Sequence, residues 1–204
     1  MIRIVLFGDS ITAGYTDGYP SSKFSDMLKA KLGREDVYCF NRGLPNSTIT
    51  VALERLQADV LTIEPNYVVP FFGLADARQK QSLPASTFAV ALTKLVRQIT
   101  PEKCLLITPG VVAKDSPVNV RLEEYAQATR QVASTTHCDL IPWHNHMAAA
   151  PKKMLQADGI HYSTLAYDEL TTMLATRFKQ RLASFNMISS ARQFMGKRQS
   201  HDNN

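Results

Sequence analysis

The stretch Ile4-Val5-Leu6-Phe7-Gly8-Asp9-Ser10 is a short apolar run followed by a glycine turn that carries an acid and a serine. A continuously apolar run that ends at a turn is typical of a strand buried on both faces. Glycine permits the tight turn that follows it. The stretch therefore predicts a buried strand whose end places the hydroxyl of Ser10 at one edge of a sheet.

Further apolar runs alternate along the chain with segments in which apolar residues recur at helical spacing. We expect strands over residues 2–7, 37–40, 67–72, 104–108 and 140–142, and helices over residues 22–32, 48–58, 85–99, 121–134 and 164–184. Strands that alternate with helices in this way form βαβ units and a parallel sheet. The predicted fold is therefore an α/β three-layer α/β/α sandwich with a mainly parallel sheet of about five strands.

The composition suits one globular domain. The chain has 204 residues, of which 45% are hydrophobic, and this is enough for a single core. We expect the domain to cover residues 1–185. Residues 186–204 are polar and basic, and we expect them to form a flexible tail.

Composition also bears on location and partners. No apolar run approaches the roughly 20 residues of a membrane-spanning helix, and the apolar start of the chain is too short for a signal peptide. The net charge of +5 comes without a basic stripe interleaved with aromatic residues. We therefore expect a cytoplasmic protein with a small-molecule substrate, no nucleic-acid partner and no stable membrane association.

Ligands of parallel α/β sheets bind at the carboxyl ends of the strands, so the loops that leave those ends are candidates for chemistry. Four loops near those ends combine glycine with polar residues: Gly8-Asp9-Ser10, residues 41–47 around Gly43, residues 72–76, and Asp158-Gly159-Ile160-His161. Each of them taken alone also fits an ordinary turn. For Asp9, Gly73 and Asp76 we expect turn-capping and loop-bracing roles rather than proton transfer.

The last of these loops places an imidazole three residues after a carboxylate. Asp158 can bond one ring nitrogen of His161 and leave the other nitrogen to face a hydroxyl. Together with Ser10, these residues supply the hydroxyl, the base and the orienting acid that activate a serine nucleophile.

A second histidine motif, Trp143-His144-Asn145-His146, invites comparison with metal sites. Two histidines at this spacing, with no third ligand nearby in the sequence, make a weak metal motif. We therefore expect a solvent-facing loop at residues 143–146, and neither a metal ion nor a cofactor in the protein.

In this order, the four loops resemble the four sequence blocks of the SGNH hydrolases, also known as GDSL-type esterases and lipases. The resemblance runs from residue 1 to about residue 180. It implies a flavodoxin-like fold and hydrolysis of esters, thioesters or acetylated sugars. It also implies that Ser10 is the nucleophile, His161 the base and Asp158 its orienting acid, with the N–H groups of Ser10 and Gly43 binding the oxyanion.

The third block departs from the family pattern. Gly73-Leu74-Ala75-Asp76 stands where the family has Gly-x-Asn-Asp, so Ala75 replaces an asparagine whose side chain donates to the oxyanion. Loss of one such donor typically lowers kcat by about 100- to 1000-fold. Three readings stay open: Asn46 substitutes for the missing donor, the enzyme works slowly with two donors, or its activity is poor.

We expect a serine hydrolase that cleaves small carboxylic esters with short acyl chains, because the domain has little length for a lid. Leu74, Val111 and Val112 are candidates for lining an apolar acyl pocket. A carbohydrate O-deacetylase, a thioesterase or a lysophospholipase would need the same triad. A degenerate member that binds an ester or sugar with little turnover is the non-enzymatic alternative, and Ala75 is its support.

Overall fold

The first strand, β1 (Ile2–Gly8), lies between β2 (Val37–Gly43) and β3 (Tyr67–Phe71) in the computed structural model of the protein, and it pairs in parallel with both. The structure describes residues 1–113 and 116–199. Pairing on both edges satisfies the backbone of β1, and its apolar side chains from Ile4 to Phe7 are fully buried, as the continuous apolar run predicts.

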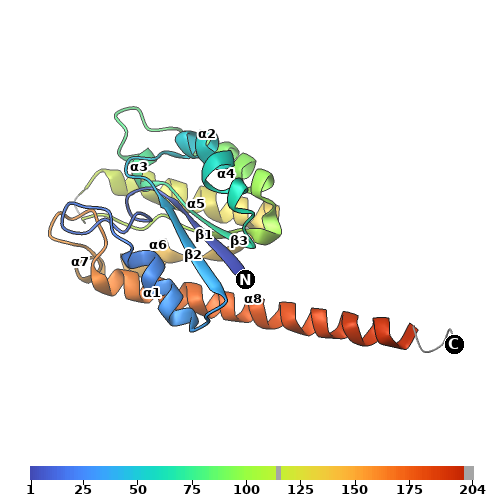
Figure 1. Cartoon of the computed structure of the whole chain (residues 1–204). Helices are drawn as coiled ribbons and strands as arrows, with labels where there is room; N and C mark the ends of the chain where they lie inside the picture. The colour runs from blue at the N-terminus through green and yellow to red at the C-terminus, as the bar shows by residue number, and fades with distance from the viewer. Residues whose placement is uncertain (114–115, 200–204) are drawn as a thin grey trace.

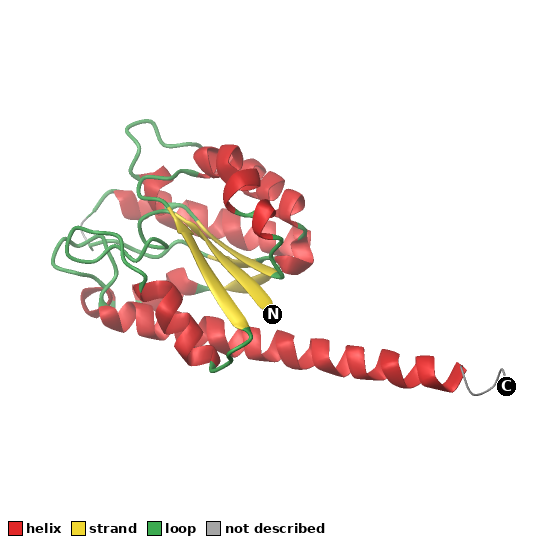
Figure 2. Cartoon of the chain, in the orientation of Figure 1, coloured by secondary structure: helices red, strands yellow, loops and turns green. Residues whose placement is uncertain are grey.

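The sheet continues beyond β3 through a second parallel pair. β4 (Leu105–Ile107) pairs with β5 (Asp139–Ile141), and a parallel bridge between Val68 and Cys104 joins this pair to β3. The strand order is therefore β2-β1-β3-β4-β5. The strands lie between the helices (Figure 2). The prediction of a mainly parallel sheet is confirmed, although β4 and β5 are short and a single bridge attaches them.

Helices cover both faces of this sheet (Figure 1). On one face α1 (Lys23–Leu32) packs against α8 (Thr164–Gln199), and on the other α2 (Ile49–Asp59) and α5 (Val118–Thr136) pack against α4 (Ala85–Ile99). The predicted three-layer α/β/α arrangement is confirmed. None of the helices in the described ranges combines the length and apolarity that a bilayer crossing requires.

Local signals in the sequence explain where several helices begin and end. The helix predicted over residues 85–99 is α4, with the predicted bounds. α1 ends at Gly33, which adopts the left-handed conformation with φ of 62°. The hydroxyl of Thr48 accepts from the N–H of Val51 at the start of α2, and the hydroxyl of Ser163 accepts from the N–H of Ala166 at the start of α8.

Short helical segments complete the connections: α3 (Leu74–Ala77), α6 (Trp143–Ala148), α7 (Pro151–Met154), η1 (Leu61–Ile63) and η2 (Pro101–Lys103). The prediction of a solvent-facing loop at residues 143–146 is wrong. Trp143 and Met147 are both fully buried, because they stand one helical turn apart and face the core, and His144 is buried beside them.

Other predicted boundaries are also wrong: α5 is longer than the helix predicted over residues 121–134, β4 is shorter than the strand predicted over residues 104–108, and two further differences concern β2 and the last helix. β2 continues through Asn41 and Arg42 to Gly43, because the edge of β1 offers hydrogen-bond partners to polar residues as readily as to apolar ones. The closing helix does not end at residue 184 but continues to Gln199, through a segment that contains no proline. Residues 186–199 are therefore helical; residues 200–204 lie outside the described residues, and the flexibility of the tail stays a prediction.

The end of β2 lies directly against the turn that follows β1. A Cβ atom on Gly43 would lie 2.1 Å from the backbone nitrogen of Ala13 and 2.5 Å from the carbonyl carbon of Thr12. No side chain fits into that space, so glycine is required at position 43 for packing. The close approach brings the second of the four loops next to the turn that carries Ser10.

Candidate active site

The turn after β1 is held in place by a buried carboxylate. Asp9 accepts hydrogen bonds from the N–H of Ile11, over 3.0 Å, and from the N–H of Ala75, over 3.1 Å. Burial raises the pKa of Asp9 to about 7, although these two hydrogen bonds act in the opposite direction. The carboxylate thereby connects the turn that carries Ser10 to the first turn of α3.

The three residues of the predicted triad form one hydrogen-bonded chain. The Oδ2 atom of Asp158 lies 2.6 Å from Nδ1 of His161, and Nε2 of His161 lies 3.2 Å from Oγ of Ser10. Ser10 and His161 are both buried to about nine-tenths, at 9% exposure each. Hydroxyl, imidazole and carboxylate are therefore arranged in the order that proton transfer from the hydroxyl requires.

The backbone of the last loop orients the acid. Oδ1 of Asp158 accepts from the N–H groups of Ile160 and His161, each over 2.9 Å. Burial opposes ionisation of Asp158, but the hydrogen bonds from His161 and from these two N–H groups outweigh it, so the pKa of Asp158 lies below its usual value. The carboxylate is thus ionised at neutral pH and keeps both of its oxygens bonded.

Two residues that we did not single out in the sequence support His161. The ring of Tyr15 lies against the imidazole, with 4.4 Å between the ring centroids. The side-chain amide of Gln156 donates to the carbonyl oxygens of Tyr15 and Tyr162, over 2.9 and 2.8 Å. The bond between Gln156 and Tyr15 joins residues 141 positions apart in the chain, and no local sequence signal reports it.

The second loop does not offer Gly43 as a free donor. The N–H of Gly43 donates to Oδ1 of Asn41 over 2.9 Å, and Nδ2 of Asn41 donates to the carbonyl oxygen of Thr12 over 2.8 Å. Asn46, further along the same loop, adopts the left-handed conformation with φ of 62° and is exposed. Within the described ranges, no hydrogen bond uses the backbone N–H of Asn46.

The third loop carries the alanine that departs from the family pattern. Gly73, with φ of 127°, leads into α3, where Ala75 is buried and offers only its backbone N–H, which Asp9 accepts. Asp76 accepts from the N–H of Ile49 over 3.0 Å, and burial raises the pKa of Asp76 to about 6. Asp76 thus braces the third loop against the start of α2.

The two histidines of α6 bind protein groups. Nδ1 of His144 lies 2.9 Å from the carbonyl oxygen of Pro109, and Nε2 lies 2.7 Å from a carboxylate oxygen of Glu123. His146 pairs with Glu169. Across residues 1–113 and 116–199, no three histidine, cysteine or acidic side chains stand close enough together to hold a metal ion.

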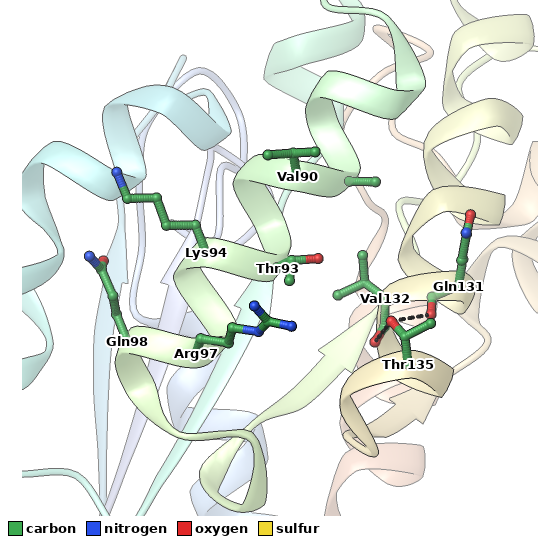
Figure 3. A pocket seen from close by; sticks show the side chains of 9 residues that line it. Val90, Thr93, Lys94, Arg97, Gln98, Gln131, Val132 and Thr135 are labelled. Atoms are coloured by element: carbon green, nitrogen blue, oxygen red, sulfur yellow. Dashed lines mark hydrogen bonds between the residues drawn. The ribbon is translucent and has the colours of Figure 1, made fainter.

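A hollow of about 570 Å³ opens beside the acid of the triad. Polar side chains line most of it, among them Thr16, Asp17, Lys23, Gln156 and Asp158. A comparable groove of about 600 Å³ lies between α4 and α5, where Val90, Lys94, Arg97 and Val132 line it (Figure 3). That groove contains none of the predicted site residues, so of these two cavities it is the hollow beside Asp158 that adjoins the predicted triad.

Fold and site together define an α/β/α hydrolase scaffold with a Ser–His–Asp chain at the carboxyl edge of the sheet. Residues 6–169 match the model of the GDSL-like Lipase/Acylhydrolase family. The chain belongs to this family, and the resemblance read from the four loops is confirmed.

Individual relatives agree with the family. The chain is 25% identical to the isoamyl acetate-hydrolyzing esterase of Schizosaccharomyces pombe over 82% of this chain and 71% of that one. It superposes on the crystal structure of a lipase/acylhydrolase from Enterococcus faecalis with a TM-score of 0.83 and 35% identity, over 89% of this chain and 97% of that one. An acetylxylan esterase from Geobacillus stearothermophilus shares the fold, with a TM-score of 0.70 and 19% identity, over 86% and 92% of the two chains. Family and relatives indicate a carboxylic ester hydrolase.

The raised pKa of Asp9 predicts a pH-dependent contribution to stability. The carboxyl ionises near pH 4 in the unfolded chain but only at about 7 when folded. Between these values the folded chain binds more protons than the unfolded chain, so the stability that Asp9 contributes falls as pH rises. We expect the free energy of unfolding of the wild type, relative to Asp9→Asn, to fall by a few kcal/mol between about pH 4 and pH 8. Urea unfolding at several pH values measures this, and a difference independent of pH would contradict it.

Proposed function

We propose that the protein is a serine hydrolase that cleaves small carboxylic esters through an acyl intermediate on Ser10. The observation that carries this proposal is the hydrogen-bonded chain from Asp158 through His161 to Ser10. Membership of the lipase/acylhydrolase family supports the reaction class. The relative named for the hydrolysis of isoamyl acetate, a small ester with a short acyl group, supports the substrate class.

In the proposed reaction, Oγ of Ser10 attacks the ester carbonyl while Nε2 of His161 accepts the hydroxyl proton. The tetrahedral intermediate collapses, and His161 returns that proton to the departing alcohol. Water then attacks the acyl-Ser10 carbonyl with His161 again as base, which releases the carboxylic acid and restores the serine. Asp158 keeps Nδ1 protonated and stabilises the imidazolium form.

The oxyanion hole of this mechanism has few donors. The N–H of Ser10 is used by no hydrogen bond within the described part of the chain and is the first donor. Gly43, the second donor expected from the sequence, would have to release Asn41 before it could act. The N–H of Asn46, in the same loop, is used by no hydrogen bond within the described ranges and needs no such exchange, so the backbone of Asn46 is the alternative second donor.

A fluorophosphonate probe tests the nucleophile. We expect one probe per chain, attached at Ser10, and we expect Ser10→Ala to lose both labelling and at least about 1000-fold in kcat with p-nitrophenyl acetate. Ser134→Ala, which changes an exposed serine on α5, is the matched control and should label like the wild type. Full esterase activity in Ser10→Ala would overturn the mechanism. A wild type that binds esters but takes no label would favour a degenerate binding protein.

Because Ala75 stands where the family has an asparagine, restoring the side-chain amide at this position is expected to raise activity. We expect Ala75→Asn to raise kcat by tens to hundreds of times, because it restores a side-chain donor worth about 100- to 1000-fold elsewhere. Ala77→Asn, at an equally buried alanine of the same short helix, is the matched control and should not raise kcat. If Ala75→Asn leaves kcat unchanged, another donor already fills the role and the oxyanion hole is not reduced.

The polar hollow beside Asp158 favours a second candidate, an O-deacetylase acting on a carbohydrate. Its hydroxyl, amide and charged side chains suit a polyhydroxylated alcohol better than an apolar one. Steady-state kinetics on p-nitrophenyl acetate, p-nitrophenyl octanoate, isoamyl acetate and an acetylated xylo-oligosaccharide separate the candidates. We expect acetyl esters to be preferred over octanoate, and a higher kcat/KM for the acetylated sugar than for isoamyl acetate would favour the deacetylase.

A further inference from the structure

Arg55 is a largely buried cation at the edge of the sheet that carries the candidate site, and the predicted triad does not include it. It projects from α2, and its side chain is only 13% exposed. The guanidinium lies over the ring of Phe7, with 4.3 Å between Cζ and the ring centroid. A buried guanidinium is costly unless its N–H groups are bonded. The hydrogen-bond partners of Arg55 therefore indicate its role.

Those partners belong mainly to the two loops of the site. Nη2 donates to the carbonyl oxygen of Gly8 and Nη1 to the carbonyl oxygen of Arg42, each over 2.9 Å. Nε donates to the hydroxyl of Ser47 over 3.1 Å. Nη1 also pairs with the carboxylate of Asp59 over 2.6 Å. Three of the four contacts thus reach the ends of β1 and β2 and the loop that follows β2.

The two carbonyl groups that accept from Arg55 lie where β1 and β2 end and the loops of the candidate site begin. The Gly8 carbonyl belongs to the peptide that begins the nucleophile turn, and it also accepts from the N–H of Leu44 over 3.0 Å. The Arg42 carbonyl belongs to the peptide that supplies the N–H of Gly43. The sheet ladder ends here, since Gly8 and Gly43 are the last paired residues of β1 and β2. Beyond this point, the planar guanidinium connects the two chain segments.

We propose that Arg55 is a positioning residue for ester hydrolysis, which sets the spacing between the turn of Ser10 and the loop that carries the second oxyanion donor. The inference rests on the function proposed above, with Ser10 as nucleophile. This role needs the planar guanidinium of arginine, because its N–H groups point in fixed directions toward two carbonyl oxygens and a hydroxyl. A lysine has the charge but offers a single ammonium group, which cannot reproduce that geometry.

Arg55→Lys and Arg55→Ala test the role, with kcat expressed per Ser10 titrated by the fluorophosphonate. We expect Arg55→Lys to lower kcat for p-nitrophenyl acetate by about 10- to 100-fold, because small displacements of reacting groups have effects of this size. KM should change little, since no contact with substrate is lost. Millimolar guanidinium chloride should restore part of the kcat of Arg55→Ala, whereas sodium chloride at equal ionic strength should not.

Two control variants separate positioning from ion pairing. Arg34 forms a bidentate pair with Asp36, over 2.9 and 2.8 Å, ahead of β2 and so at the opposite end of the strand. Arg34→Ala should therefore leave kcat unchanged. Asp59→Asn removes the carboxylate partner of Arg55 but keeps the carbonyl and hydroxyl contacts, so its kcat should stay near that of the wild type.

Several results would overturn the proposal. These are an unchanged kcat per titrated site in Arg55→Lys, an absence of rescue by guanidinium, or a loss in Asp59→Asn as large as that in Arg55→Lys. Arg55 variants that do not fold would also overturn it, since the contacts would then maintain the fold rather than the site. Failure of the proposed function is distinguishable, because the wild type itself would then take no label at Ser10.

Discussion

The carboxyl end of β1 is the point on which the rest of the site depends. β1 is paired on both edges and covered on both faces, so strand pairing satisfies its backbone N–H and C=O groups. This pairing ends at Gly8, and the chain beyond Gly8 needs other hydrogen-bond partners. Because β2 and β3 run parallel to β1, the loops that follow all three strands open at the same edge. The loop with Asp158 and His161 completes the site from the start of α8, and Gln156 joins that loop to the segment after Ser10.

Beyond the last ladder hydrogen bonds, buried charged side chains hold the loops together. Asp9 and Asp76 accept from backbone N–H groups, while Arg55 donates to backbone carbonyl groups. Asp9 and Asp76 connect segments that have no strand pairing with one another, and Arg55 connects the paired strands β1 and β2 at the point where their ladder ends. The raised pKa values of the two acids are the electrostatic consequence, because burial opposes their ionisation.

Pattern and spacing predicted most of the elements, and their failures have specific causes. The strand at residues 2–7 follows from a continuous apolar run and the helix at residues 85–99 from helical periodicity, and both are local properties of the sequence. The polar residues and glycine at positions 41–43 predict a loop, yet they lie in β2, because pairing with β1 is independent of polarity. Trp143 was assigned to solvent, and only packing of α6 against the core shows that it is buried.

The sequence by itself determined the fold class and the family, and it predicted Ser10, His161 and Asp158 as a triad, since apolar patterns and the Asp158–His161 spacing are local features of the chain. Tertiary structure alone decided which groups meet. The ring of Tyr15 lies against that of His161, the N–H of Gly43 donates to Asn41, and Arg55 joins the ends of two strands. These contacts connect distant or differently folded segments, and their distances and directions come from the packing of the sheet and its helices, which no pattern along the chain encodes.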